Sequence, residues 1–157
     1  MKFLWIPYTS EHAAAAETFI DPEAVKNTGI EDGWDDYVSY WKNEPDVSYG
    51  EDFFAFMIKD GEECVAVIAV GLHEDELSVP EIIVSPEKRG RGVGGEILTE
   101  LLSETVSIIG KEKRLARAVI FPGNEASKRA FLKAGFEYES SHPDGDADYY
   151  IWKPTEN

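Results

Sequence analysis

Apolar and polar residues along the chain alternate in some stretches and repeat at helical spacing in others, and these patterns divide the chain into elements. Apolar runs bounded by turn residues are typical of strands. They predict strands over residues 2–8, 52–59, 63–72, 77–84, 115–121, 136–139 and 149–153. Apolar or aromatic residues three or four positions apart predict helices over residues 10–19, 36–43, 92–110 and 124–134. Residues 21–33 are predicted to form a loop or a broken helix.

Turn and capping residues mark several of these boundaries. The pair Asp60-Gly61 predicts a hairpin between the second and third strands. Pro80 has no backbone N–H and therefore predicts a bulge or an edge-like kink in the fourth strand. Asn124 is a favourable cap for the last helix, and Gly135 can end that helix.

The order of the elements predicts one sheet with helices packed on it. The order is strand, two helices, three strands in a meander, helix, strand, helix and two strands. This mixture is typical of the α/β or α+β class. A chain of 157 residues suits one hydrophobic core, so we expect residues 1–157 to form a single domain.

Charge restricts the classes of partner. The chain has 31 acidic and 15 basic residues, a formal net charge of -16 and a pI of about 4.5. Nucleic acid and an anionic membrane surface would be repelled, so neither is expected as a partner, whereas a cationic substrate is tolerated. The alternative is that the acidic residues serve only solubility, since charged surfaces are usually solvated.

The cysteine and histidine residues argue against a disulfide or a metal site. The one cysteine, Cys64, lies in an apolar run, and a single cysteine excludes an internal disulfide. The histidines His12, His73 and His142 are far apart and lack metal-ligand spacing, so no metal is expected. No apolar run has the length of a signal peptide or a membrane span, and we therefore expect a cytoplasmic protein.

Residues 85–96, SPEKRGRGVGGE, combine four glycines with Lys88, Arg89 and Arg91 at a predicted strand–helix junction. Glycine lets the backbone approach a ligand closely, and the free N–H groups at a helix start attract anions. The stretch therefore predicts a local site for a phosphate-bearing ligand in an otherwise acidic protein. The alternative is a tight connection without a ligand.

The spacing Gly90-x-Gly92-x-x-Gly95 also matches the dinucleotide-binding fingerprint. That fingerprint directly follows its strand and is followed about 20 residues later by an acidic residue. Here five residues separate the strand from Gly90, and the region near Leu115 has no acidic residue so placed. Nicotinamide dinucleotide binding is therefore the weaker interpretation.

Another interpretation accounts for more residues than the dinucleotide fingerprint does, and it rests on two blocks of the chain, residues 82–94 and 124–136. The first block, IIVSPEKRGRGVG, resembles motif A of the GNAT N-acetyltransferase superfamily, with Arg89, Gly92 and Gly94 in the places of its Gln/Arg-x-x-Gly-x-Gly/Ala core. The second block, NEASKRAFLKAGF, resembles motif B. The resemblance covers about residues 52–140, and it implies the GNAT fold: a single central mixed, mostly antiparallel sheet flanked by helices.

The resemblance implies acetyl-CoA as co-substrate. Its pyrophosphate would lie on the backbone amides of residues 89–95, with Lys88 and Arg91 adding positive charge. Its pantetheine arm would run along the fourth strand, where this strand and the fifth splay apart. The residues expected to bind acetyl-CoA are Ile82, Ile83, Val84, Arg89, Gly90, Arg91, Gly92, Val93, Gly94, Gly95, Asn124, Ser127 and Phe131.

The family transfers the acetyl group to a primary amine, commonly by direct attack in a ternary complex. Many members place a tyrosine as general acid at the position of Phe131, which has no proton to give. Tyr138 is our candidate for this role, with Tyr149 and Tyr150 as alternatives, or the thiolate leaves unaided. A non-catalytic acyl-CoA-binding or sensor module on the same fold is the remaining alternative.

Glu81 is the candidate general base, since it precedes the strand segment beside the expected thioester. The alternatives are Glu76 and His73, or a Glu81 that is only a surface residue. Another position used by the family for an acid holds Val119 here.

Acidic and aromatic segments are candidates for holding a cationic amine, a small molecule or a free amino group, by charge and cation–π contact. The residues are Asp35, Asp36, Trp41, Asp144 and Asp146, and the alternative is exposed solubilising acids with core aromatics. Many family members dimerise, so a homodimer is compatible with the resemblance, although the sequence identifies no dimer surface.

Overall fold

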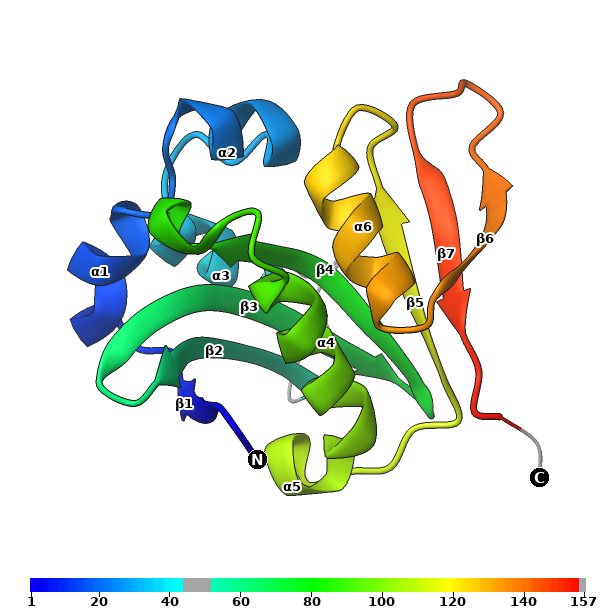
Figure 1. The fold of residues 1–157 in the computed structure, drawn as a ribbon, viewed down its shortest axis with the longest axis horizontal. Helices are drawn as coiled ribbons and strands as arrows, with labels where there is room; N and C mark the ends of the chain where they lie inside the picture. Colours follow the sequence, from blue (N-terminus) through cyan, green and yellow to red (C-terminus); the bar gives the residue numbers. More distant parts are fainter. Residues whose placement is uncertain (44–51, 156–157) are drawn as a thin grey trace.

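One mixed sheet organises the computed structural model, which describes residues 1–43 and 52–155 (Figure 1). Within these residues the sheet is seven-stranded, in the order β1-β2-β3-β4-β5-β7-β6. Every neighbouring pair is antiparallel except β4 and β5, which are parallel. This confirms the predicted mixed, mostly antiparallel sheet. The strands are β1 Leu4–Pro7, β2 Phe53–Asp60, β3 Glu63–His73, β4 Glu76–Val84, β5 Leu115–Ile120, β6 Glu137–Ser141 and β7 Asp148–Trp152.

Helices cover both faces of the sheet. Figure 1 shows α4 and α6 in front of the sheet, with α1 and α3 at the opposite face and α2 at the upper edge. The helices are α1 Ala13–Glu17, α2 Pro22–Thr28, α3 Trp34–Asn43, α4 Val93–Ser103, α5 Thr105–Ile109 and α6 Glu125–Lys133. Two short 3-10 turns, η1 Ser10–His12 and η3 Pro86–Lys88, complete the described elements.

The sheet has a hydrophobic core on each face, which explains why β3 is apolar at nearly every position. Ala66 and Ile68 pack in the core beneath α4 and α6, whereas Val67 and Ala69 pack in the core beneath α1 and α3. A strand that is buried on both faces has no polar side to produce alternation.

The region between β1 and β2 is more helical than expected. Residues 22–28 form a true helix, because Asp21 accepts a hydrogen bond from the Ala24 N–H at 2.9 Å and Gly29 ends the helix with a φ of 75°. The next helix begins at Trp34, two residues before its predicted start. The Glu17 carboxylate caps it by accepting from the Trp34 N–H at 3.0 Å.

The helix predicted over residues 92–110 is two helices. The backbone leaves helical geometry at Glu104, with φ of -120° and ψ of 30°, between α4 and α5. The apolar spacing continues across this break, since Leu101 and Ile109 both lie in the core beneath α4 and α6. Hydrophobic periodicity alone could therefore not locate the break.

Strands β4 and β5 separate after a short paired segment. They pair only where Glu76–Ser78 meets Leu115–Arg117 in the described part of the chain. On the other side of β4 the register with β3 shifts between Ala69 and Gly71, opposite Pro80. The predicted bulge at Pro80 is confirmed, and the predicted splay opens beside the second half of β4.

No helix in the described ranges is long and apolar enough to cross a membrane.

Glu100 on α4 attaches the N-terminal strand to the rest of the protein. Its carboxylate accepts hydrogen bonds from the Lys2 N–H at 2.6 Å, from the Phe3 N–H at 3.3 Å and from the Trp5 Nε1–H at 2.6 Å. By contrast, Glu96 makes an ion pair with the exposed Lys2 ammonium at 2.7 Å.

We expect Glu100→Ala to lower the free energy of unfolding by about 2–3 kcal/mol, because three donors lose a charged acceptor and two of them are partly buried. Glu96→Ala is the matched control on the same helix and should cost less than about 1 kcal/mol, as exposed ion pairs contribute little. Urea unfolding of both variants tests this. Equal losses would show that Glu100 is no more than another surface acid.

Candidate active site

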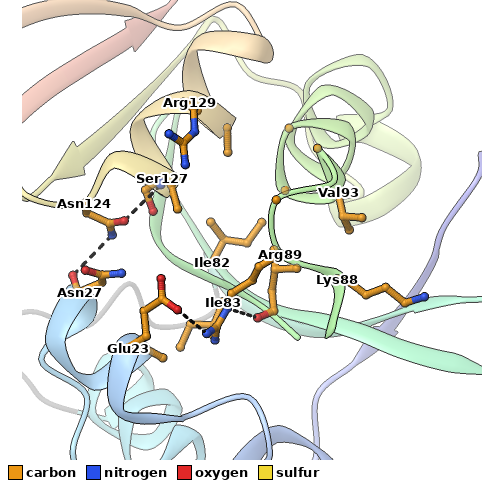
Figure 2. A pocket seen from close by; sticks show the side chains of 18 of the residues that line it. Glu23, Asn27, Ile82, Ile83, Lys88, Arg89, Val93, Asn124, Ser127 and Arg129 are labelled. Atoms are coloured by element: carbon orange, nitrogen blue, oxygen red, sulfur yellow. Dashed lines mark hydrogen bonds and ion pairs between the residues drawn. The ribbon is translucent and has the colours of Figure 1, made fainter. Parts of the chain in front are cut away.

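A cavity of about 370 Å³ lies between the second half of β4, the glycine-rich loop, α2 and α6 (Figure 2). It occupies the opening left where β4 and β5 separate. The lining residues are Glu23, Ala24, Asn27, Thr28, Ile82, Ile83, Val84, Lys88, Arg89, Gly90, Gly92, Val93, Gly94, Gly95, Asn124, Ala126, Ser127, Arg129, Ala130 and Lys133.

The glycine-rich loop gives this cavity unsatisfied backbone donors. Gly90 and Gly92 have φ values of 76° and 79°, which a side chain would disfavour. Gly92 is the N-cap of α4 and provides no side-chain cap, and the first helical bond runs from the Glu96 N–H to the Gly92 carbonyl at 3.1 Å. The N–H groups of the first turn of α4 therefore lack intrahelical acceptors and are free to donate hydrogen bonds to an anion.

Two further glycines let α6 approach this helix start. A Cβ on Gly94 would lie 3.3 Å from the Ala130 Cβ, and a Cβ on Gly95 would lie 2.6 Å from the Lys133 Cδ. Lys133 crosses over the loop, and its Nζ donates to the Gly92 carbonyl at 3.1 Å.

The positive charge at the cavity comes from a different element than the sequence suggested. Lys88 contributes to the lining, but its ammonium points away and pairs with Glu63 at 3.1 Å (Figure 2). Arg91 is exposed and does not line the cavity. Arg129 and Lys133 of α6 line it instead. Their spacing of four residues on one helix face was the signal that sequence reasoning missed.

The Arg89 side chain holds the loop to α2 and does not point at an anion. Its guanidinium pairs with Asp21 at 2.8 Å and donates to the carbonyls of Phe19 at 3.0 Å and Val84 at 3.1 Å. The hydrogen bond from Arg89 holds the pKa of the Asp21 carboxyl below its usual range. Arg89 lines the cavity, but it acts as the connection that places α2 at the cavity edge.

Asn124 connects α6, on the other side of the cavity from the glycine-rich loop, to α2. Its side-chain oxygen caps α6 by accepting from the Ser127 N–H at 3.2 Å, and its Nδ2 donates to the Asn27 carbonyl at 3.5 Å (Figure 2). The predicted capping role of Asn124 is confirmed. Its side chain is buried, and both Asn124 and Ser127 line the cavity.

A second cavity of about 200 Å³ adjoins the first and shares Asn27, Thr28, Ile82, Asn124 and Ser127 with it. The other lining residues are Tyr37, Trp41, Val79, Pro80, Glu81, Val119, Ile120, Phe121 and Phe131. Phe131 is buried against Phe136, with ring centroids 4.9 Å apart, and belongs to this cavity rather than to the first.

Glu81 brings a carboxyl group with unusual acidity to the second cavity. Desolvation raises its pKa to about 8, against a small opposing effect of the Ile82 N–H, which donates to its Oε1 at 3.2 Å. A carboxyl group of this kind changes protonation state near neutral pH, as a general base requires. The structure thus places Glu81 next to Ile82, which borders both cavities.

The other predicted chemical residues lie elsewhere. Tyr138 is 56% exposed on β6, with its hydroxyl 2.6 Å from the Ser141 Oγ, and it lines neither cavity. The alternatives Tyr149 and Tyr150 also line neither cavity, and Tyr150 is buried. Glu76, one of the alternative candidates for the base, forms an ion pair with Arg117 at 2.6 Å.

Of the residues expected to hold a cationic amine, only Trp41 lines the second cavity. Asp35 accepts a hydrogen bond from the Tyr8 hydroxyl, and Asp36 is exposed. Asp144 and Asp146 lie on the exposed turn between β6 and β7, close to His142. The predicted acidic acceptor site is not assembled by these residues.

Comparison with known proteins gives one family. A model of the acetyltransferase (GNAT) family matches residues 10–136. The L-2,4-diaminobutyric acid acetyltransferase of Shouchella clausii is 29% identical over 85 residues, which make up 52% of this chain and 46% of that protein. The match therefore spans about half the length of this curated relative.

Solved acetyltransferases have the same fold. An acetyltransferase from Thermus thermophilus superposes with a TM-score of 0.73 at 19% identity over 98% of both chains. The aminoglycoside acetyltransferase AAC(6')-Ib with paromomycin and acetyl-CoA gives 0.75 at 17% identity over 98% of this chain and 94% of that one. A chimeric spermidine N-acetyltransferase from Vibrio cholerae and hSSAT gives 0.69 at 11% identity, over 98% and 96% of the chains.

The raised pKa of Glu81 predicts a pH-dependent stability. A folded-state pKa of about 8, above the ordinary value of 4.5, means that ionising Glu81 opposes folding as the pH rises between these values. Glu81→Gln removes this cost. We expect the melting temperature of the variant, relative to the unaltered protein, to be about 7–14 °C higher at pH 8 than at pH 5.

Thermal unfolding at the two pH values measures this difference. Glu62→Gln, in the exposed turn between β2 and β3, is the control and should shift the melting temperature equally at both. A Glu81→Gln variant whose relative stability does not change with pH would mean that the Glu81 carboxyl is well solvated.

Proposed function

The chain belongs to the acetyltransferase (GNAT) family, and we propose that it is an acetyl-CoA-dependent N-acetyltransferase that acetylates a primary amine by direct attack in a ternary complex. One observation carries this proposal. An anion-binding cavity and a cavity containing a carboxyl group adjoin along the unpaired half of β4.

The first cavity has the donors that acetyl-CoA requires. Diphosphate needs several hydrogen-bond donors, and the N–H groups of Val93, Gly94 and Gly95 supply them at the helix start. Arg129 and Lys133 add positive charge on the α6 side. The backbone of residues 82–84, left unpaired by β5, offers hydrogen bonds to the amide groups of a pantetheine arm.

The second cavity has the group that prepares an amine for attack. A primary ammonium has a pKa near 10.4 and must lose a proton before it can act as a nucleophile. Glu81 accepts this proton. The amine nitrogen then bonds to the acetyl carbon of the thioester as the carbon–sulfur bond breaks, and the CoA thiolate leaves. The nitrogen loses its second proton to this thiolate, which yields the neutral acetamide and CoA thiol.

Departure of the thiolate without a protein acid fits the structure better than protonation by Tyr138. Phe131 occupies the place of the usual tyrosine, and Tyr138 lies outside both cavities. A thiol with a pKa of about 8.5 is a tolerable leaving group. Thr28, Tyr37 and Ser127 supply the hydroxyl groups that line the second cavity.

The names of the relatives support amine acetylation in general. They include a diaminobutyric acid acetyltransferase, an aminoglycoside acetyltransferase with acetyl-CoA bound and a spermidine N-acetyltransferase. The alternative, a non-catalytic acyl-CoA-binding module, leaves Glu81 without a purpose, because a desolvated carboxyl group opposes folding at neutral pH.

We expect acetyl-CoA and CoA to raise the melting temperature, and NAD to leave it unchanged. A ligand at a hundredfold excess over its dissociation constant stabilises the folded state by about 2.7 kcal/mol. Gly92→Val should abolish the shift and weaken CoA binding at least tenfold, because the side chain disturbs the left-handed N-cap. A Cβ there meets only the mobile end of Lys133, at 2.5 Å, so the fold should persist.

Gly110→Val is the matched control for Gly92→Val. Gly110 has a similar φ of 75°, so the backbone strain is the same, but it ends α5 and lines neither cavity. This variant should keep its response to CoA. If CoA shifts the melting temperature of Gly92→Val as much as that of Gly110→Val, the glycine-rich loop is not the phosphate site. A shift with NAD alone would contradict the proposal and indicate a nucleotide-dependent enzyme instead.

Glu81→Gln should lower kcat/KM at least a hundredfold at pH 8, since a general base contributes about 10²- to 10⁴-fold. In the unaltered enzyme kcat/KM should rise with pH up to about 8, where Glu81 becomes ionised. The variant should lose this rise. CoA thiol release across pH 6–9 measures both, and the same pH profile in both proteins would exclude Glu81 as the base.

A further inference from the structure

The second cavity contains very little charge. Among the described residues that line it, Glu81 is the one ionisable acid, and no lysine, arginine or histidine is present. The cations Arg129 and Lys133 line only the first cavity. This inference rests on the proposed function, in which Glu81 is occupied with the reacting amine.

Two of the neutral polar side chains that line the cavity, those of Thr28 and Asn124, are committed to the protein. The Thr28 hydroxyl donates to the Ala24 carbonyl at 2.7 Å and accepts from the Ile30 N–H at 3.1 Å. The Asn124 side chain is occupied by the cap of α6 and by the Asn27 carbonyl. These groups are poorly placed to solvate a second charge on a substrate.

Apolar and aromatic side chains form most of the remaining wall, which also includes Asn27 and Ser127. Tyr37 and Trp41 on α3 lie edge to face, with ring centroids 6.4 Å apart. Strands β4 and β5, the residue after β5, and α6 contribute a larger apolar set, which consists of Val79, Pro80, Val119, Ile120, Phe121 and Phe131. At about 200 Å³, against about 370 Å³ for the first cavity, the second cavity suits a small substrate.

We infer that the acceptor is a primary monoamine with an uncharged, apolar or aromatic body, rather than a polyamine, an aminoglycoside or an amino acid. A single ammonium group meets Glu81, and the apolar body meets the aromatic and aliphatic wall. The net charge of -16 attracts such a cation to the protein without selecting among amines. Selection therefore depends on the cavity.

The excluded classes each bring a charge for which the described lining of the cavity offers no partner. A second ammonium would be desolvated without an acidic partner among these residues, because the one lining carboxylate serves the reacting nitrogen. A substrate carboxylate would lie near Glu81, and the described lining has no cation to receive it. Sites discriminate strongly against a ligand that leaves a buried charge unpaired. This specificity differs from what the names of the diaminobutyric acid and spermidine acetyltransferases state of those proteins.

Matched amine pairs test the inference, with CoA thiol release as the assay and kcat/KM as the quantity. Butylamine is compared with 1,4-diaminobutane, which adds only a second ammonium, and 2-phenylethylamine with phenylalanine, which adds only a carboxylate. We expect each monoamine to exceed its charged partner at least tenfold.

A substitution at the cavity wall should change this preference. Val119 is 55% exposed and lines the cavity, so Val119→Asp adds a second acid there without disturbing the core. It should raise the ratio of kcat/KM for 1,4-diaminobutane over butylamine about tenfold. Val106→Asp is the control: Val106 is also 55% exposed but lies on α5, outside both cavities, and the ratio should stay unchanged.

The outcomes separate this inference from the proposed function. Turnover of the diamine or of phenylalanine at least equal to that of the monoamine would overturn the monoamine assignment and leave the N-acetyltransferase intact. No turnover of any amine by a protein that binds acetyl-CoA would overturn both. A ratio that Val119→Asp does not change would overturn the second cavity as the acceptor site.

Discussion

The loss of pairing between β4 and β5 is the constraint on which both cavities depend. The two strands are joined over Glu76–Ser78 and then diverge, so the second half of β4 has protein on one side and an opening on the other. A parallel pair that continued to the end would fill this opening with backbone hydrogen bonds. The two cavities adjoin in the space that the strands leave, and they share Ile82 of β4 as part of their walls.

The divergence alone would not give an anion site in a protein with a net charge of -16. Two of the three cations in the glycine-rich loop are used to hold the structure, since Lys88 pairs with Glu63 and Arg89 pairs with Asp21. The attraction that we propose for an anion therefore rests on the backbone N–H groups of α4 and on the cations of α6. The ion pairs of Lys88 and Arg89 hold the loop and α2 in place.

Much of the fold could be predicted from the sequence because strands, turns and caps are local signals. The Asp60-Gly61 hairpin, the Pro80 bulge and the Asn124 cap all appear as predicted. Of the thirteen residues predicted to bind acetyl-CoA, eleven line the first cavity, all except Arg91 and Phe131, since two motifs supplied them. The residues that α2 contributes to the same cavity were not predicted. The sequence could not reveal which side chains face one another across α4 and α6, and so it assigned to Lys88 and Arg91 the charge that Arg129 and Lys133 provide. The choice of Tyr138 as general acid lost its support for the same reason, because a position in a strand does not reveal which elements lie opposite it.

The bulge at Pro80 decides whether the Glu81 carboxyl group lies in the second cavity or in the main core. Leu77 and Val79 pack in the core beneath α4 and α6, and so does Ile82, although an uninterrupted strand would place residues 79 and 82 on opposite faces. The register shift opposite Pro80 supplies the extra residue that reconciles them. In a regular strand Glu81 would share the face of Leu77 and Val79 and would be buried in the main core, where a carboxyl group has no partner. With the bulge, Glu81 turns with Ile83 toward the face covered by α3, and the proposed base lies in the second cavity, whose wall includes Tyr37 and Trp41. One imino acid, which cannot extend the ladder to β3, thus places the proposed chemistry on the acceptor side of the opening.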